Sequence, residues 1–430
     1  MELIAGQINK TKSSYRWKIL SLLFFSTTIN YLDRNVLSIL APTLQKEYGW
    51  SEIDYGFIVS AFQLAYGLGV VFVGKLLDRV GNRIVFAVAI AIWSLASMGH
   101  ALARTVIEFA IARFFLGLGE SANFPACVKS VTEWFPRKER ALATGIFNAG
   151  SNIGAILAPL LIPVVVVTCG WQWAFIFTGC FGLFWLICWL ASYRLPEKHK
   201  RVSPAELAYI NADEDAPVEK ISWMRLLTRR ETITLCLSRF FTDPVWWFLL
   251  YWLPKFLDKQ YGVSLTELGL PLITIYIIAD LGGISGGWLS SHYIKKGKGV
   301  NRSRKSAMLI CALCALPIVF ISQIPPLWVS VGLISLACAA HCGWAANIYT
   351  LVSDQYPKSA VATIIGISTF SAVLGSMLVS SAVGFVLEKT GSYSLIFTTA
   401  AFMYLLGWII IQIGIPKIKP ISFHQPSQET

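Results

Sequence analysis

The run IVFAVAIAIWSLASMGHALA, from Ile84 to Ala103, decides the fold of this chain. It contains no Lys, Arg, Asp or Glu. It has the roughly 20 mostly apolar residues that a helix needs to cross the hydrocarbon core of a bilayer. Basic residues flank it, with Arg83 directly before it and Arg104 directly after it. We therefore predict a transmembrane helix over these residues.

Similar apolar runs recur along the whole chain. Of its 430 residues 55% are apolar and only 14% are charged, whereas a soluble protein carries roughly 25% charged residues. This deficit excludes a soluble protein, because most of the surface cannot face water. Helices are predicted rather than barrel strands, because the runs are long and do not alternate. Eleven further spans are predicted, at 17–43, 53–74, 106–129, 140–167, 172–194, 232–257, 266–289, 306–324, 327–352, 360–387 and 392–415.

The basic residues are distributed unevenly between the two sides of the predicted membrane. Most of the 36 Lys and Arg residues lie in the N-terminal tail and in the loops that an even number of spans puts on the same side. The positive-inside rule therefore predicts that both termini lie in the cytoplasm. We expect an integral protein of the plasma (inner) membrane. The net charge of +12 is spread over many loops, so we predict no nucleic-acid partner. The opposite side receives Lys46, Arg104, Lys255, Lys259 and Lys389.

The second half of the chain repeats the first. An offset of 213 residues aligns Gly49 with Gly262, and an offset of 221 aligns Gly154 with Gly375, each within a longer matching stretch. We predict an N-terminal six-helix bundle over 1–195, a cytoplasmic linker over 196–230 and a C-terminal six-helix bundle over 231–430. Two parallel repeats indicate a binding site between the halves and alternating access by rocking.

Two motifs carry a resemblance to a known family. The stretch GKLLDRVGNR, from Gly74 to Arg83, resembles the loop 2–3 signature of the major facilitator superfamily. The stretch RFFLGLGE, from Arg113 to Glu120, resembles the fourth-helix signature of the same superfamily. The resemblance covers nearly the whole chain. It implies an all-α membrane fold of twelve helices in two pseudo-symmetric bundles.

Other stretches resemble one branch of that superfamily, the anion:cation symporters. They are NYLDRN at 30–35, GESANFP at 119–125, and EWFP at 133–136 followed by ERA at 139–141. RFFTDPVW at 239–246 and ADLG at 279–282 look most like the hexuronate transporters. This likeness implies a secondary active transporter, a proton-coupled symporter of an organic anion that is a sugar acid such as a hexuronate. The implied partners are that anion, protons and the bilayer; we expect a monomer that is not an enzyme and needs no cofactor.

Charged residues inside the predicted spans are candidate functional residues, because each costs roughly 2.5–3.5 kcal/mol on insertion scales. Asp33 and Arg34 interrupt the first span, and neighbours on a helix face different directions. A guanidinium binds a carboxylate through two parallel hydrogen bonds, so we predict that Arg34 holds the carboxylate of the substrate. The alternative is that Arg34 is an internal counter-ion for Asp33 or Glu120.

Glu120 and Asp33 are the candidates for proton coupling. Burial favours the neutral form of a carboxyl group, so Glu120 could exchange a proton between two states of the transporter. The family resemblance assigns coupling acids to these same two positions. The alternative is a structural ion pair between Glu120 and Arg113. His341 occupies the repeat position of Glu120, which makes it a candidate for the proton path or a donor to a substrate hydroxyl. The alternative is a buried structural histidine.

A sugar acid also needs hydroxyl partners and a flat apolar face. Asn148 and Asn152 are one turn apart, so they share a helix face. The tyrosine and tryptophan candidates depend on the resemblance more than on chemistry. The full set of further substrate-binding candidates is Tyr31, Tyr66, Asn148, Ser151, Asn152, Trp247, Asn347 and Thr369.

A last group of residues is assigned to gating or structure. Arg239 and Asp243 are four residues apart and can pair within one helix. In the loop motif we expect a cytoplasmic latch, with the acid at a helix end and glycines that permit a tight turn. The group comprises Gly74, Asp78, Arg79, Gly81, Arg83, Arg113, Arg239, Asp243 and Asp280.

Two alternatives to symport remain open at this point. One is an exchanger of another organic anion, including a sugar phosphate. The other is a membrane receptor or sensor built on a transporter scaffold, which would bind its ligand without accumulating it. We predict no metal site, because the nine cysteines lie mostly within apolar spans without a metal-ligand spacing.

Overall fold

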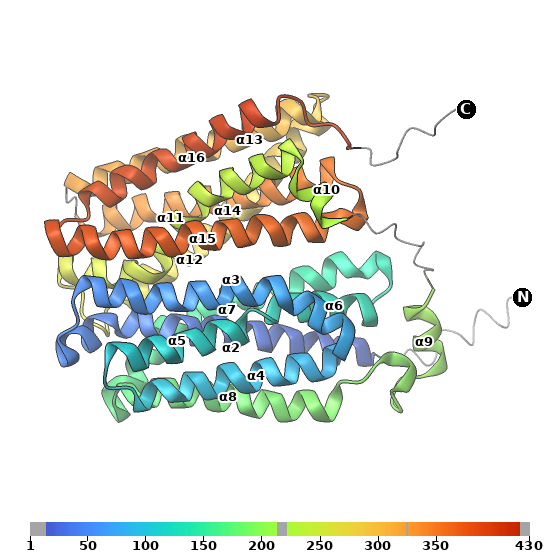
Figure 1. Cartoon of the computed structure of the whole chain (residues 1–430), viewed down its shortest axis with the longest axis horizontal. Helices are drawn as coiled ribbons and strands as arrows, with labels where there is room; N and C mark the ends of the chain where they lie inside the picture. The colour runs from blue at the N-terminus through green and yellow to red at the C-terminus, as the bar shows by residue number, and fades with distance from the viewer. Residues whose placement is uncertain (1–13, 213–221, 324–325, 422–430) are drawn as a thin grey trace, which may run out of the picture. The chain divides into compact units, whose positions relative to one another are not determined.

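The computed structural model describes residues 14–212, 222–323 and 326–421. Within these ranges the chain is helical almost throughout and has no β-strand (Figure 1). The predicted cytoplasmic tails extend into 1–13 and 422–430, and part of the predicted linker is 213–221; these residues lie outside the described ranges.

Helices cover all twelve predicted spans within the described ranges, and the predicted all-α membrane fold is confirmed. The fourth span is divided between α5 and α6, and the ninth ends in a 3₁₀ segment, η3. The long elements are α2 (Tyr15–Tyr48), α3 (Glu52–Val80), α4 (Asn82–Gly99), α5 (Val106–Glu120), α6 (Asn123–Trp134), α7 (Arg137–Cys169), α8 (Trp171–Ser192), α11 (Arg230–Tyr261), α12 (Gly269–Lys295), α13 (Val300–Ala315), η3 (Leu316–Gln323), α14 (Leu327–Gln355), α15 (Lys358–Thr390) and α16 (Ser394–Gly414). The predicted linker holds two short helices, α9 (Pro204–Ile210) and α10 (Trp223–Leu227).

Nine helical segments in the described residues are long and apolar enough to cross a membrane. The three predicted spans outside this group are the first, fourth and seventh, in α2, α5 with α6, and α11. These three contain Asp33 and Arg34, Arg113 and Glu120, and Arg239 and Asp243. Of these, α2 and α11 are long enough but not apolar enough, whereas the fourth span is divided between α5 of 15 residues and α6 of 12 residues.

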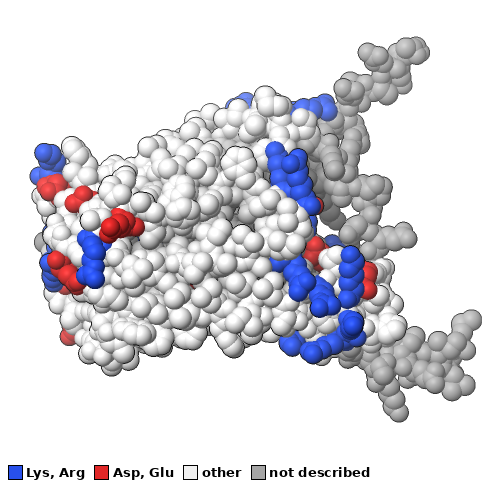
Figure 2. All heavy atoms as spheres, turned by 60° about the horizontal axis from the view of Figure 1, so that its bottom comes forward, with Lys and Arg blue, Asp and Glu red and all other residues white. Residues whose placement is uncertain are grey.

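The surface agrees with a membrane environment. Figure 2 shows Lys, Arg, Asp and Glu gathered toward the ends of the helices, with a broad band between them that carries none. Large apolar side chains are exposed on many helices, among them Phe72 at 65%, Phe184 at 67% and Ile284 at 71%. Such exposure suits hydrocarbon and is unfavourable in water.

The chain forms two compact units by internal contacts. The first comprises Met1–Leu40 and Leu64–Pro217, and the second comprises Ala41–Gln63 and Val218–Thr430. Within the second unit, Glu52 forms an ion pair with Lys255, and the Tyr55 hydroxyl donates to the Tyr251 carbonyl at 2.6 Å. These contacts are why the 41–63 segment clusters with later residues. The six-helix boundaries drawn from the repeat remain a prediction, since compactness does not test them.

Close helix packing occurs at matching positions of the two halves. A Cβ on Gly154 of α7 would lie 2.4 Å from the Thr28 carbonyl oxygen of α2, and one on Gly375 of α15 would lie 2.2 Å from the Phe240 carbonyl oxygen of α11. Gly154 and Gly375 are the pair that the offset of 221 aligns. Backbones approach this closely only where glycine removes the side chain. The packing therefore supports the internal repeat.

A second pair of glycines supports the same repeat. A Cβ on Gly69 of α3 would lie 2.1 Å from the Ser121 hydroxyl, and one on Gly282 of α12 would lie 2.3 Å from Cα of Ala339 on α14. Gly69 and Gly282 are 213 residues apart. Gly286, four residues after Gly282, is packed equally closely, with a Cβ position 2.4 Å from Cα of Gly343.

Candidate substrate and proton site

A buried ion pair lies within the first unit. Arg34 of α2 contacts one oxygen of Glu120, Oε2, through Nη2 at 2.8 Å and Nε at 2.9 Å. Both residues are almost fully buried, with 4% and 1% of their surfaces exposed. Of the alternatives for Arg34, the structure contains the contact with Glu120. A pair of this kind is stable in low dielectric because each charge compensates the other.

Glu120 lies where a helix is interrupted. The α5 helix ends at Glu120, a turn follows at Ser121 and Ala122, and α6 begins at Asn123. The second carboxylate oxygen, Oε1, is buried and accepts no hydrogen bond from the described residues. A proton can therefore bind Oε1 without displacing an existing partner.

Asp33 points toward different elements from its neighbour. Its Oδ1 accepts a hydrogen bond of 2.8 Å from Ser97 on α4, and the Ser97 hydroxyl lies 3.1 Å from that of Thr178 on α8. Asp33 is fully buried, and its Oδ2 has no hydrogen-bond partner in the described residues. Asp33 and Arg34 therefore belong to two separate polar networks, because consecutive residues of a helix point about 100° apart.

Arg113 contacts the backbone of Arg34. Its Nη1 donates to the backbone carbonyl of Arg34 at 3.3 Å, and the residue is fully buried. This contact joins α5 to the backbone of α2. The gating or structural role of Arg113 stays a prediction.

Aromatic rings surround the guanidinium of Arg34. Its central carbon lies 4.7 Å from the centre of the Tyr31 ring and 5.1 Å from that of Tyr66. The Asn30 side-chain oxygen also accepts from Nη2 at 3.2 Å. Cation–π contacts stabilise a charge that has little access to water. The two predicted tyrosines therefore adjoin Arg34.

The predicted polar face of α7 is partly self-bonded. Ser151 donates to the carbonyl of Asn148 at 2.6 Å and contacts the Asn152 side-chain oxygen at 3.2 Å. Ser151 is buried, Asn152 is partly exposed and Asn148 is exposed. The contacts of Gly150 and Gly154 with α2 bring this helix against the segment that carries Tyr31.

The second unit contains its own charged cluster. Arg239 binds Asp243 through Nη2 at 2.8 Å, so the predicted pairing within α11 is present. Its Nη1 donates to the hydroxyls of Ser368 at 3.0 Å and Thr369 at 2.9 Å. Thr369, a predicted substrate contact, therefore has Arg239 as its partner in this structure.

Two aromatic side chains contact His341. Its ring stacks on that of Trp246, with centres 5.0 Å apart and planes 9° apart, and its Nδ1 is 2.9 Å from the Tyr404 hydroxyl. The residue is buried, with 8% exposed. These contacts are of the kind that the structural alternative for His341 expects, and its part in proton transfer stays a prediction as well.

Three other predicted residues of the second unit are Asn347, Trp247 and Asp280. Asn347 donates to the carbonyls of Gly286 and Gly343 at 3.0 and 2.9 Å, which commits its amide to the packing of α12 against α14. Trp247 stacks on Tyr251 with ring centres 5.7 Å apart. Asp280 is half-buried on α12.

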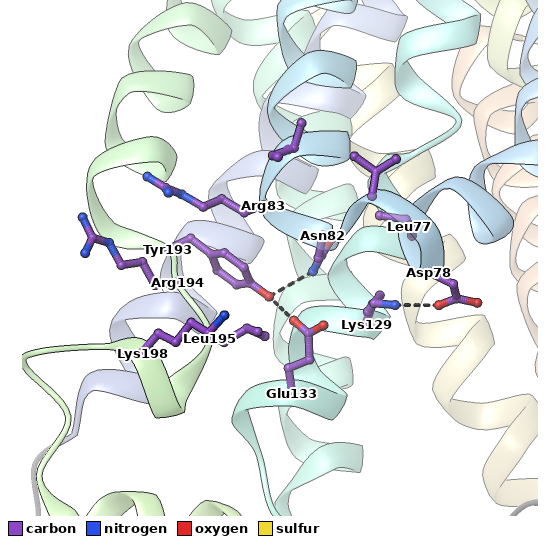
Figure 3. A pocket seen from close by; sticks show the side chains of 13 residues that line it. Leu77, Asp78, Asn82, Arg83, Lys129, Glu133, Tyr193, Arg194, Leu195 and Lys198 are labelled. Atoms are coloured by element: carbon purple, nitrogen blue, oxygen red, sulfur yellow. Dashed lines mark hydrogen bonds and ion pairs between the residues drawn. The ribbon is translucent and has the colours of Figure 1, made fainter.

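The loop motif turns between α3 and α4. Gly81 has φ of 95°, a conformation that favours glycine, and it directly precedes the first residue of α4. Asp78 pairs with Lys129 of α6 at 2.5 Å (Figure 3). Arg83 donates through Nη2 to the Leu190 carbonyl at 2.6 Å. Gly74 and Arg79 are exposed. The motif thus joins α3, α4, α6 and α8 at one end of the first unit.

A comparison with family models matches residues 23–380 to the Major Facilitator Superfamily. The chain belongs to this superfamily. It is therefore a membrane transporter and not an enzyme.

Curated relatives of this superfamily member carry sugar-acid names. The hexuronate transporter of Escherichia coli K12 is 33% identical over 403 residues, which are 92% of this chain and 93% of that protein. The galacturonate transporter of Dickeya chrysanthemi is 35% identical over 305 residues, or 69% of this chain and 88% of that protein. Among solved structures, a D-xylose–proton symporter matches with a TM-score of 0.73 at 17% identity, covering 95% of this chain and 98% of that one. The latter likeness shows the fold.

Sequence reasoning missed several residues that support the site in this superfamily member. Ser97 binds Asp33, and Trp246 and Tyr404 hold His341. Lys129 binds Asp78. Polar residues at membrane depth could have drawn attention to Ser97, but partners from distant helices leave no local pattern in the sequence.

Proposed function

We propose that this transporter is a proton-coupled symporter of an organic anion, a sugar acid such as a hexuronate, and that it works by alternating access. The buried ion pair of Arg34 and Glu120 carries the proposal. It joins the group best suited to bind a carboxylate to the group best suited to carry a proton. The hexuronate and galacturonate names of the relatives support the substrate class.

The proposed coupling follows from competition for one guanidinium. While Glu120 is ionised, it occupies Arg34. Protonation of Glu120 removes the negative charge and leaves a buried cation, which costs several kcal/mol unless another anion replaces it. The carboxylate of the substrate is that anion. When the substrate leaves, Glu120 releases its proton and pairs with Arg34 again.

The neighbours of Arg34 supply the rest of the proposed site. Tyr31 and Tyr66 offer flat faces beside the guanidinium, which suit the apolar face of a sugar ring. Asn148, Ser151 and Asn152 offer amide and hydroxyl groups for the hydroxyls of the substrate. Asp33 is a second candidate for a coupled proton, because its Oδ2 has no partner in the described residues.

The test is uptake of labelled glucuronate and galacturonate by proteoliposomes, with and without an inward proton gradient. We expect accumulation that requires the gradient. Glu120→Gln should abolish accumulation but preserve exchange of internal for external substrate, since a neutral side chain mimics the protonated state. Arg34→Ala should abolish both. Glu47→Gln is the matched control, because Glu47 is exposed and lies away from the ion pair.

Three outcomes would contradict this proposal. Gradient-driven accumulation that survives Glu120→Gln would remove Glu120 from coupling. An active, folded protein that takes up neither sugar acid would exclude the hexuronate class. Exchange without any response to the proton gradient would instead identify an exchanger.

A further inference from the structure

A cavity of about 570 Å³ lies in the first unit, at the loop motif rather than at Arg34. It is formed by the end of α3, the start of α4, one face of α6, and the chain that follows α8 (Figure 3). Its lining contains four basic and two acidic side chains. The lining residues are Leu77, Asp78, Val80, Gly81, Asn82, Arg83, Ile84, Lys129, Glu133, Tyr193, Arg194, Leu195 and Lys198.

The acidic side chains of the cavity already have partners. Asp78 pairs with Lys129 at 2.5 Å, and Glu133 accepts a hydrogen bond from the Tyr193 hydroxyl. Burial raises the pKa of Glu133, which lies near the end of α6 beyond the predicted span, while the bond from Tyr193 opposes that rise. Neither acid therefore neutralises the remaining cations.

The remaining cations are Arg83, Arg194 and Lys198. Arg83 donates Nη2 to the Leu190 carbonyl, but its Nε is buried and has no partner in the described residues. The side chains of Arg194 and Lys198 form no hydrogen bond or ion pair with any described residue, and both are exposed. A cavity with three uncompensated cations has the electrostatics of an anion site.

The start of α4 adds to this positive field. No side chain caps the helix, so the amide groups of its first turn have no intrahelical or side-chain acceptor. The positive end of the helix dipole points the same way. A Cβ on Gly81 would meet nothing within 4 Å, which leaves open space beside these amides. Phosphate groups bind well at such positions.

The rim of the cavity is apolar. Val80, Ile84 and Leu195 are 46%, 57% and 40% exposed. A soluble anion gains nothing from these side chains, whereas acyl chains bury them. A cationic cavity with an apolar rim fits a lipid, whose headgroup phosphate meets the cations and whose acyl chains meet the rim. The basic residues favour a lipid with net negative charge over a zwitterionic one.

We propose that this cavity binds the phosphate headgroup of an anionic phospholipid, with the acyl chains lying along Val80, Ile84 and Leu195. Arg83, Arg194 and Lys198 hold the phosphate oxygens. A zwitterionic lipid binds less well, because it brings its own cation among three others. The site is independent of the proposed transport substrate.

The test measures binding of dioleoylphosphatidylglycerol to the purified full-length protein in detergent, by native mass spectrometry and by the lipid-dependent rise of the thermal midpoint. Dioleoylphosphatidylcholine and inorganic phosphate are the comparison probes. Arg194→Gln/Lys198→Gln should weaken phosphatidylglycerol binding on the order of 30-fold, the loss of two basic contacts. Lys200→Gln/Arg201→Gln is the matched control, since it removes two exposed charges outside the lining and should leave binding unchanged.

A second variant separates a lipid from free phosphate. Ile84→Ser should weaken phosphatidylglycerol binding and leave any effect of inorganic phosphate unaltered. Equal losses in both charge variants, equal stabilisation by phosphatidylcholine, or a phosphate effect as large as that of the lipid would each overturn the proposal. The lipid-free thermal midpoint of each variant reports whether it is folded.

Discussion

The guanidinium groups of Arg34 and Arg239 are both buried, yet their surroundings differ. Arg239 is held by Asp243 on its own helix and by the hydroxyls of Ser368 and Thr369. Arg34 meets a carboxylate from a distant helix, Glu120, together with two aromatic rings. A pair formed between helices can separate when the helices move, whereas an i, i+4 pair moves as one body. Arg34 is therefore the better candidate for a cation that changes partner.

The first prediction concerns the shape of this cation. Arg34→Lys keeps the charge but loses the planar fork that binds a carboxylate through two hydrogen bonds. We expect uptake of the sugar acid to fall by about 100-fold, the equivalent of about 2.7 kcal/mol. The measurement is initial uptake rate in proteoliposomes, with Arg201→Lys as the control. Uptake within twofold of the unaltered protein would show that charge alone suffices.

The second prediction separates a structural role of His341 from a proton-carrying one. Tyr404→Phe removes the hydrogen bond to His341 and keeps the ring, and His341→Gln removes the imidazole. If the contact is structural, each change lowers stability by about 1 kcal/mol, and the double variant loses little more than either single one. The measurement is thermal unfolding in detergent together with gradient-driven uptake. Loss of accumulation in His341→Gln alone would place His341 in the proton path.

At the scale of helices, glycines set where backbones touch. Gly154 meets the Thr28 carbonyl and Gly375 meets the Phe240 carbonyl, while Gly145 and Gly366 have open space at the Cβ position. The third prediction is that Gly154→Ala and Gly375→Ala lower the thermal midpoint, because overpacking costs about 1–3 kcal/mol. Gly145→Ala and Gly366→Ala are matched controls. They should be neutral or stabilising, since alanine gains about 1 kcal/mol over glycine in a helix.

The element scale also shows what hydropathy cannot resolve. The sequence predicts one span over 106–129, and the structure divides it into α5 and α6 at a turn over Ser121 and Ala122. A window average does not register a two-residue turn within apolar surroundings. The break matters, because it places Glu120 at the end of a helix.

At the scale of the whole molecule, much of the fold could be predicted. The length of the apolar runs was enough to predict the fold, because the bilayer requires helices of about 20 residues. Two sequence motifs were enough to predict the family. The glycine contacts at matching positions agree with the repeat found by counting. The site was harder. Arg34 and Glu120 are 86 residues apart, and nothing in the spacing chooses between Glu120 and Asp33 as a partner.

Some side chains could not be placed from the sequence at all. Asn347 was predicted to bind substrate, and in this structure its amide donates to two backbone carbonyls. A polar residue on an apolar helix has the same pattern whether it faces a ligand or a neighbouring backbone. Only the geometry of α12 and α14 distinguishes the two.

The fourth prediction tests the orientation of the chain. A membrane-impermeant thiol reagent should label Arg104→Cys from outside intact cells and label Arg201→Cys only in inside-out vesicles. The background is a variant in which the exposed residues Cys169 and Cys180 are replaced by Ser. The physical reason is the retention of basic loops in the cytoplasm. Labelling of Arg201→Cys from outside would reverse the predicted orientation.

The three spans that carry the buried charges, in α2, α5 with α6, and α11, also bear on biogenesis. The spans in α2 and α11 are less apolar than the other nine segments, and the third is divided between two short helices, α5 and α6. Insertion by the translocon depends on hydrophobicity, and a central Asp or Arg opposes it. Because α2 is made well before Glu120, Arg34 must wait for its partner during synthesis. We therefore expect α2 to remain beside the translocon until α5 emerges. The charges proposed for transport would then slow the release of α2 into the bilayer.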